Sequence, residues 1–232
     1  MTAFGAFSSN PSALTDNGHD NSLGYGARIG YLGDWSETFS VGASYQTKIS
    51  MGAFDNYAGL FAEEGAFDIP AVFTVGVAVR PVESVDVVFD YQRMNYSQIT
   101  AIAAPLLPNL MMAPLGTDDG AGFGWQDVNA YKAGVELRAT PQWTFRGGYS
   151  YSGQPIPESE MIFNILAPGV VEQHATFGVS YSLGETKGIH FSVTRAFPKS
   201  VTGPNNLEAP GAQMIGLEMN QWDLEFGYSF GF

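Results

Sequence analysis

The residues of this chain whose types could do chemistry are its three histidines and its many serines. His174 and His190 fall on neighbouring predicted strands with both side chains on the polar face, where a pair could bind a metal or exchange protons. His174 lies near one end of its strand and His190 near the opposite end of the next. At about 3.3 Å per residue, the two imidazoles are therefore expected to be tens of ångströms apart. His19 lies in a polar segment with no cluster around it.

A hydrolase would need a serine within hydrogen-bond reach of a histidine. Serines occur along the whole chain, so the sequence singles out no such pair. The glycine-rich stretch 120–124 lacks the Lys-Ser/Thr ending of a phosphate-binding loop. We therefore predict no catalytic residue, no metal ligand and no cofactor, and we expect a protein that is not an enzyme.

Six basic side chains are predicted to share the polar faces of the strands: Arg28, Lys48, Arg80, Lys132, Arg138 and Arg146. A carboxylate ligand in an apolar pocket needs such a cation. Arg80 should lie opposite Asp86 across a tight hairpin, and Arg146 opposite Glu136, as cross-strand ion pairs. Lys132 has no evident hairpin partner and is the cation that we expect to contact a ligand.

The long connections between the strands are unusually apolar. An exposed apolar cluster suggests a ligand or a partner, and unbranched methionine suits ligands of varied shape. The alternative is that the loops fold onto each other and cap the barrel, and the two interpretations are compatible. The candidate ligand-binding residues are Leu60 and Phe61, expected on a short helix, together with Leu106, Leu107, Leu110, Met111, Met112, Ile162, Phe163, Ile165 and Leu166.

Nine segments alternate between apolar and polar residues with a period of two, which is typical of strands with one apolar face. In the sixth segment, Trp143, Phe145 and Tyr149 share one face, whereas Thr144 and Ser150 share the other. The predicted strands are 22–33, 38–50, 71–80, 85–96, 127–138, 142–152, 173–183, 188–197 and 221–232.

The last predicted strand has the clearest pattern. Its apolar face consists of Trp222, Leu224, Phe226, Tyr228, Phe230 and Phe232. In water such an edge would invite aggregation, so the stripe suits a wall that faces lipid. A terminal Phe232 resembles the assembly signal of bacterial outer-membrane barrels, and we therefore expect the barrel-assembly machinery as a partner.

The predicted connections alternate in length, which is the mark of an outer-membrane barrel with short periplasmic turns and long outer loops. Tight turns are expected at 34–37, 81–84, 139–141 and 184–187, and long loops at 51–70, 97–126, 153–172 and 198–220. Two aromatic girdles are expected, Tyr31, Trp143, Tyr181 and Phe232 at one rim, and Tyr45, Tyr91, Tyr151 and Trp222 at the other.

The composition agrees with a membrane barrel. Charged residues make up 14% of the 232 residues, against about 25% in soluble domains. No run of about 18 apolar residues exists, so no transmembrane helix is predicted. A net charge of −13 argues against nucleic acid, and the lack of cysteine excludes disulfides and thiolate chemistry.

These observations predict an all-β fold, an antiparallel transmembrane β-barrel over 22–232, after a polar N-terminal segment, 1–21, that ends an extracellular loop. A soluble β-sandwich also alternates, but its solvent face would carry more charge. Nine strands would leave an open edge in the membrane, and single-chain bacterial barrels close with an even number. The start does not resemble a secretory signal, so we expect the C-terminal portion of a larger barrel.

Two stretches resemble the FadL family of outer-membrane transporters for long-chain fatty acids and other hydrophobic compounds. One is YAGLFAEEGAFDIPAVFTVGVAVRP at 57–81, and the other, 122–181, combines a GWQD step, a PIP step and an NILAPGVVE loop. The resemblance covers most of the chain from about Ser22 onward. It implies a fourteen-stranded barrel, of which this chain would supply about nine strands, without the N-terminal hatch that plugs the lumen.

The resemblance also implies a function. We expect passive diffusion of hydrophobic compounds, above all long-chain fatty acids, across the bacterial cell outer membrane, with capture among the outer loops. The expected partners are outer-membrane lipid and a hydrophobic small-molecule ligand, with no nucleic acid. Two alternatives stay open, an outer-membrane lipid hydrolase and a structural or surface-binding barrel.

Overall fold

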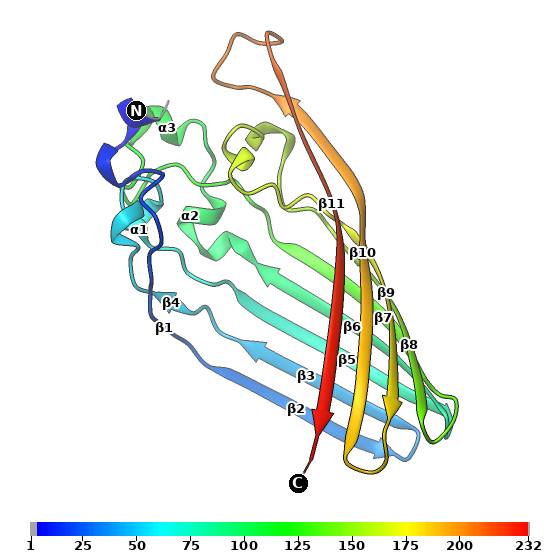
Figure 1. Cartoon of the computed structure of the whole chain (residues 1–232). Helices are drawn as coiled ribbons and strands as arrows, with labels where there is room; N and C mark the ends of the chain where they lie inside the picture. Colours follow the sequence, from blue (N-terminus) through cyan, green and yellow to red (C-terminus); the bar gives the residue numbers. More distant parts are fainter. Residues whose placement is uncertain (1–3, 232) are drawn as a thin grey trace.

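The computed structural model describes residues 4–231 and shows one curved antiparallel sheet of nine strands (Figure 1). Neighbours along the chain are neighbours in the sheet, from one edge at β2 to the other at β11. The strands are β2 Arg28–Ser36, β3 Phe39–Gln46, β5 Ala71–Val82, β6 Val85–Asn95, β7 Val128–Arg138, β8 Trp143–Ser152, β9 Gln173–Ser182, β10 Lys187–Pro204 and β11 Met214–Phe230.

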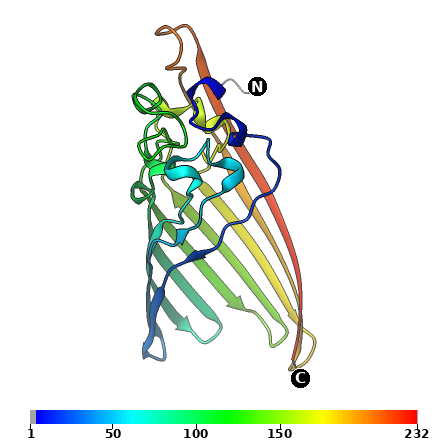
Figure 2. The same ribbon diagram turned by 90° about the vertical axis from the view of Figure 1, so that its left-hand side faces the viewer.

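The all-β prediction and the nine long strands are confirmed. Within the described residues the two edge strands do not pair with each other, so the sheet curves as an open part of a barrel (Figure 2). Short turns connect the strands at one end, and the long loops gather at the other. Phe232, the predicted assembly signal, lies outside the described residues.

The predicted loop 198–220 is wrong in its bounds, because β10 and β11 extend well into it. Phe197 and Pro198 lie opposite the single residue Asn220 in a β-bulge, and pairing resumes at Lys199 with Met219. A bulge accommodates the proline, which cannot donate to a ladder. The connection that is left is 205–213, at the tip of a hairpin that projects beyond the other strands (Figure 1).

The first two predicted strands are also shorter than expected. The pairing of β2 with β3 ends at Arg28 and Gln46. Beyond it, the backbone N–H of Ala27 donates to the Thr47 side chain instead of to a carbonyl. The chain then forms a separate two-stranded sheet of β1 Gly24–Tyr25 with β4 Ser50–Met51.

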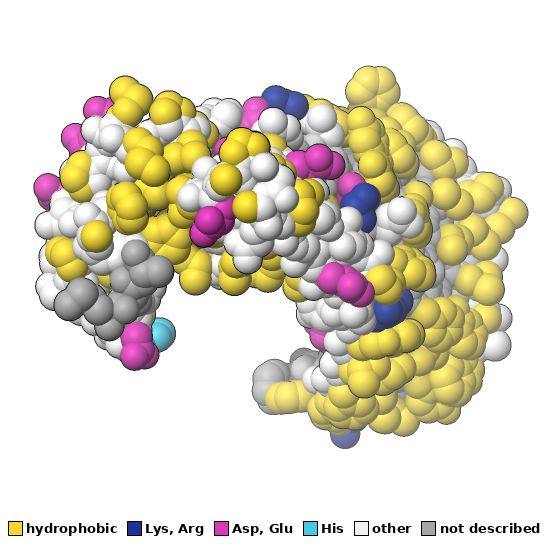
Figure 3. Space-filling model, turned by 90° about the horizontal axis from the view of Figure 1, so that it is seen from above, with side chains coloured by type: hydrophobic (Ala, Val, Ile, Leu, Met, Phe, Trp, Pro, Cys, Tyr) yellow, Lys and Arg dark blue, Asp and Glu magenta, His cyan; other side chains and the backbone are white. Residues whose placement is uncertain are grey.

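The outer face of the sheet is apolar, as the alternation predicted (Figure 3). Cross-strand pairing places large side chains side by side, for example Val179, Phe191 and Phe226 on three neighbouring strands. Near the short turns, the rings of Trp143 and Tyr181 lie 4.6 Å apart. Such a stripe suits contact with hydrocarbon.

Two adjacent residues of β9 test which face meets lipid. Phe177 points outward and is half-exposed, whereas Thr176 points inward and hydrogen-bonds Thr194. We expect Phe177→Lys to destabilise the membrane-inserted protein by about 2–4 kcal/mol, because a charge at mid-membrane loses its hydration. Thr176→Lys should be tolerated. Urea unfolding in lipid vesicles measures both, and equal losses would contradict the assignment of the faces.

Ion pairs cross the inner face near the short turns. Arg80 pairs with Asp86, N to O at 2.7 Å, and Arg146 pairs with Glu136 at 2.8 Å, so both predicted cross-strand pairs are confirmed. Arg138 contacts both carboxylates, at 2.6 and 2.7 Å, and joins the two pairs. These contacts tie β5, β6, β7 and β8 together side by side.

The long loops carry only short helices and pack into a core of their own above the sheet (Figure 1). None of the described helices is long and apolar enough to cross a membrane. The helices are η1 Gly5–Phe7, η2 Pro11–Ala13, η3 Asp55–Tyr57, α1 Ala62–Gly65, η4 Tyr96–Gln98, α2 Thr100–Ala103, α3 Asn109–Met112, η5 Glu158–Glu160 and η6 Phe163–Ile165. The core contains Leu14, Leu60, Leu106, Leu110, Leu115, Ala121, Phe123 and Phe163.

Candidate ligand-binding site

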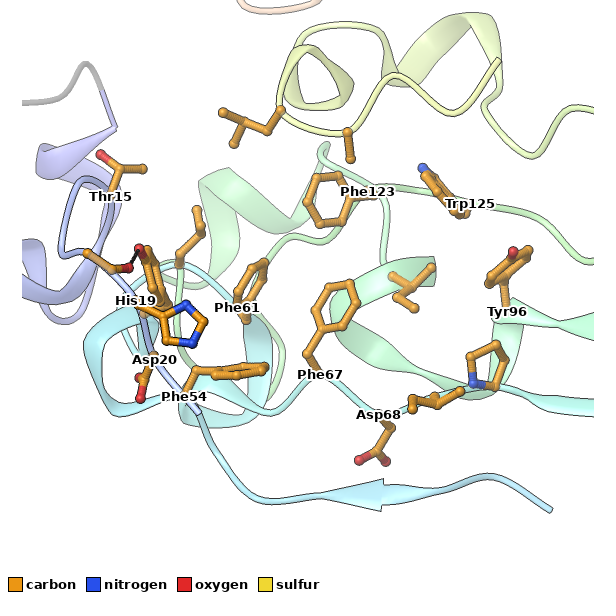
Figure 4. A pocket seen from close by; sticks show the side chains of 18 residues that line it. Thr15, His19, Asp20, Phe54, Phe61, Phe67, Asp68, Tyr96, Phe123 and Trp125 are labelled. Atoms are coloured by element: carbon orange, nitrogen blue, oxygen red, sulfur yellow. Dashed lines mark hydrogen bonds between the residues drawn. The ribbon is translucent and has the colours of Figure 1, made fainter. Parts of the chain in front are cut away.

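An apolar cavity of about 750 Å³ lies between these loops and the end of the sheet (Figure 4). Four parts of the chain form its walls: the N-terminal segment 15–20, the loop 54–70, the loop 96–125 and the residues 166–167. Seven of the 18 lining residues are large aromatics: Phe54, Tyr57, Phe61, Phe67, Tyr96, Phe123 and Trp125. Apolar pockets of this size with few polar groups are typical small-molecule sites.

Six of these side chains, all except Phe54, form one connected wall through ring contacts. The ring of Phe61 lies 4.9 Å from that of Phe67, and Phe123 lies 6.4 Å from both of them. Trp125 continues the wall, with its ring 6.4 Å from Phe123 and 5.2 Å from Tyr96, nearly perpendicular to the latter. Offset and edge-to-face contacts of this kind fix the rings and leave broad apolar faces toward the cavity.

A buried polar side chain holds the wall from behind. Asn164 is completely buried and accepts a hydrogen bond from the Trp125 indole nitrogen at 2.6 Å. Its amide nitrogen donates to the carbonyls of Phe123 and Glu160, both at 2.7 Å. The Glu160 carboxylate in turn accepts the backbone N–H of Leu106 at 2.8 Å. One amide therefore positions two of the cavity's aromatic residues.

The polar groups at the cavity are few and mostly engaged. The nearly buried Asp68 accepts the backbone N–H of Met51 at 2.8 Å and pairs with Lys48 at 2.6 Å. The hydrogen bond that the Lys48 ammonium donates to Asp68 raises the pKa of Lys48. Asp20 accepts the backbone N–H of Asn56 at 2.9 Å. Burial raises the pKa of the Tyr96 hydroxyl, which therefore stays protonated and neutral.

The predicted ligand-binding residues divide into three groups. Leu60, Phe61 and Leu166 line the cavity. Leu106, Leu110 and Phe163 are buried in the loop core behind it, with Leu107 and Ile162 packed against them. Met111, Met112 and Ile165 are exposed to solvent and line no part of the cavity.

The predicted contact of Lys132 with a ligand stays a prediction, whereas the predicted helix at Leu60 and Phe61 is wrong. Lys132 lies on β7, donates to the Gln92 side chain at 3.1 Å and lines a separate hollow on the inner face of the strands. Leu60 and Phe61 do not lie on a helix, because they follow η3 and precede α1. The turn between these helices lets both side chains reach the cavity.

Sequence reasoning missed the N-terminal segment and most of the rings. Thr15, Gly18, His19 and Asp20 form one wall of the cavity. The segment is not uniformly polar: it contains Leu14, which is 2% exposed and packs in the loop core. A signal for the rings was available: Tyr96, Phe123 and Trp125 are large aromatics that flank the strand ends instead of continuing the alternation.

His174 and His190 do not share a site. His190 hydrogen-bonds the Ser180 hydroxyl through Nδ1 and the Ser229 hydroxyl through Nε2, both at 2.9 Å. Both ring nitrogens are thus occupied by hydroxyls, which leaves none for the carboxylate that orients a catalytic histidine. His174 lies six residues away along the ladder and contacts Ser150 at 3.5 Å. Within residues 4–231 no three His, Cys, Asp or Glu side chains cluster as metal ligands.

A curved antiparallel sheet with an apolar outer face, short turns at one end and a loop-capped apolar cavity at the other defines a bacterial outer-membrane β-barrel protein. The family model described as Outer membrane protein transport protein (OMPP1/FadL/TodX) matches residues 1–220. The chain belongs to this family, and its place is the bacterial outer membrane. No curated protein sequence matches it.

Solved structures share the fold. The P. putida toluene transporter TodX is 18% identical, with a TM-score of 0.63 over 91% of this chain and 50% of its own. A Pseudomonas aeruginosa FadL homologue is 15% identical, with a TM-score of 0.64 over 88% and 52%. The Ralstonia pickettii toluene transporter TbuX is 19% identical, with a TM-score of 0.52 over 89% and 48%. The chain spans about half the length of these proteins.

Proposed function

We propose that this chain is part of a channel for hydrophobic compounds and that the loop cavity captures the ligand on the outer side of the membrane. The observation that supports this most directly is the connected aromatic wall around a cavity of about 750 Å³. Burying apolar ligand surface there is worth about 25 cal/mol per Å². Passive diffusion through the barrel then requires no covalent chemistry.

The proposal covers two ligand classes. Long-chain fatty acids are the class that the sequence resemblance implied, and their acyl chains would follow the apolar lining. Small aromatic hydrocarbons are the second class, because TodX and TbuX are toluene transporters by description. Contact of the outer face with lipid, recognition of Phe232 by the barrel-assembly machinery and the absence of nucleic acid among the partners are part of the same proposal.

Uptake by whole cells tests the function. Cells that express the complete gene are expected to accumulate a labelled hydrophobic compound faster than cells without it. Phe61→Asp should lower the initial rate about tenfold, because a carboxylate in the aromatic wall disfavours apolar contact. Met112→Asp is the control, since Met112 is 80% exposed and lies outside the cavity. Equal rates with and without the gene would refute the proposal.

A further inference from the structure

We infer that the cavity selects uncharged hydrophobic ligands and rejects carboxylates. The inference rests on the proposed function and narrows it, since a fatty acid at neutral pH carries a carboxylate whereas a hydrocarbon, alcohol or ester does not. It is drawn from the charges that surround the cavity.

The polar lining is acidic. Asp20 and Asp68 both line the cavity, and no lysine or arginine is among its described lining residues. Asp20 is held in place by the backbone N–H groups of Asn21 and Asn56, at 2.8 and 2.9 Å. A ligand carboxylate would therefore meet the negative charge of Asp20, together with an Asp68 carboxylate that is already matched by Lys48. A like charge at the site disfavours the ionised form of the ligand.

The nearby cation is already engaged. Lys48 does not line the cavity and bonds Asp68 with its ammonium at 2.6 Å. Asp68 is 8% exposed, so a ligand that drew Lys48 away would leave a nearly buried carboxylate with only the backbone N–H of Met51 as a partner. Leaving a buried charge poorly paired is strongly unfavourable.

Lys132, the inward-facing residue that was expected to contact a ligand, adds no positive charge to the cavity wall. Lys132 lines a different hollow and donates to the Gln92 side chain. The Tyr96 hydroxyl donates to the Met94 sulfur at 3.7 Å. The remaining polar side chains at the cavity, the hydroxyl of Thr15 and the imidazole of His19, can serve a neutral ligand. The Trp125 indole N–H is taken by Asn164, so this residue offers the ligand its ring face.

A matched pair of ligands tests the inference on the purified full chain. Dodecan-1-ol and dodecanoate share an alkyl chain and differ in the charge of the head group. Binding is followed at pH 8 by the fluorescence of Trp125, after Trp35, Trp143 and Trp222 have been replaced by phenylalanine. The alcohol is expected to bind at least about tenfold more tightly than the carboxylate.

A positive charge introduced into the wall should reduce the preference for the alcohol. Thr15 is half-buried at the cavity, and Thr15→Lys should raise the affinity for dodecanoate about tenfold through a charge-assisted bond. The affinity for the alcohol should stay nearly unchanged. Thr186→Lys adds the same charge in the turn at the opposite end of the sheet and should alter neither affinity.

The outcomes separate the two proposals. If wild-type protein binds dodecanoate as tightly as the alcohol, the inference is overturned and the proposed function stands; loss of that binding in Lys48→Met would then assign the carboxylate to Lys48. If neither ligand changes the Trp125 signal, in the wild type or in Thr15→Lys, the cavity is not a capture site and both proposals fail.

Discussion

Replacing Asn164 by leucine is expected to loosen the aromatic wall and to weaken ligand binding about tenfold or more. The substitution keeps the volume but removes three hydrogen bonds, one from the Trp125 indole and two to the carbonyls of Phe123 and Glu160. Each buried group left without a partner costs about 1–3 kcal/mol. Because Trp125 lines the cavity, the loss acts directly on the proposed ligand site.

Two measurements check this expectation. The emission of Trp125 should shift toward that of a solvent-exposed indole, and the ligand affinity should fall in parallel. Asn206→Leu is the matched control, since Asn206 is exposed and makes a single bond, to the Ser159 carbonyl at 2.9 Å. Unchanged emission and affinity in Asn164→Leu would show that the amide does not position the wall.

Phe163→Ala is expected to open the loop core while leaving the sheet folded. The Phe163 ring is 1% exposed and stacks on Phe123 at 5.0 Å, with Phe4 edge-on at 5.8 Å. Deleting a buried phenylalanine costs about 3–5 kcal/mol. The loops should therefore become sensitive to protease, and ligand binding should disappear.

The neighbouring Ile165 provides the control for that experiment. Its side chain is 57% exposed, so Ile165→Ala should leave both the loops and the binding intact. Circular dichroism should report the same strand content for both variants, because the strand pairs do not involve either side chain. Global unfolding of Phe163→Ala would contradict the view that the loop core is separate from the sheet.

The strands could be predicted because apolar and polar residues alternate along each of them, in accordance with its apolar outer face and its polar inner face. The prediction failed where a local feature interrupted this period, as at Phe197 and Pro198, where two residues face one across a bulge. Residues 199–204 pair regularly with β11 beyond the bulge. The alternation of apolar and polar residues is interrupted at Pro198, so the predicted strand ended at residue 197. The open edge followed from the strand count and the chemistry of an unpaired backbone in lipid.

The cavity was less accessible to sequence reasoning because its parts are distant along the chain. Apolar loops suggested a ligand site, and Leu60, Phe61 and Leu166 line an apolar cavity. Nothing in the local pattern distinguishes them from Phe163, which faces the core, or from Met112, which faces water. Whether such a side chain lines the cavity, packs in the core or faces water depends on how four separate segments pack together.

The projecting hairpin of β10 and β11 exposes a surface that is separate from the cavity. Its tip, 208–212, is exposed and stands clear of the loop core (Figure 1). It contributes no residue to the cavity wall. An antibody raised against this tip is therefore expected to bind the protein without contacting any residue of the cavity wall.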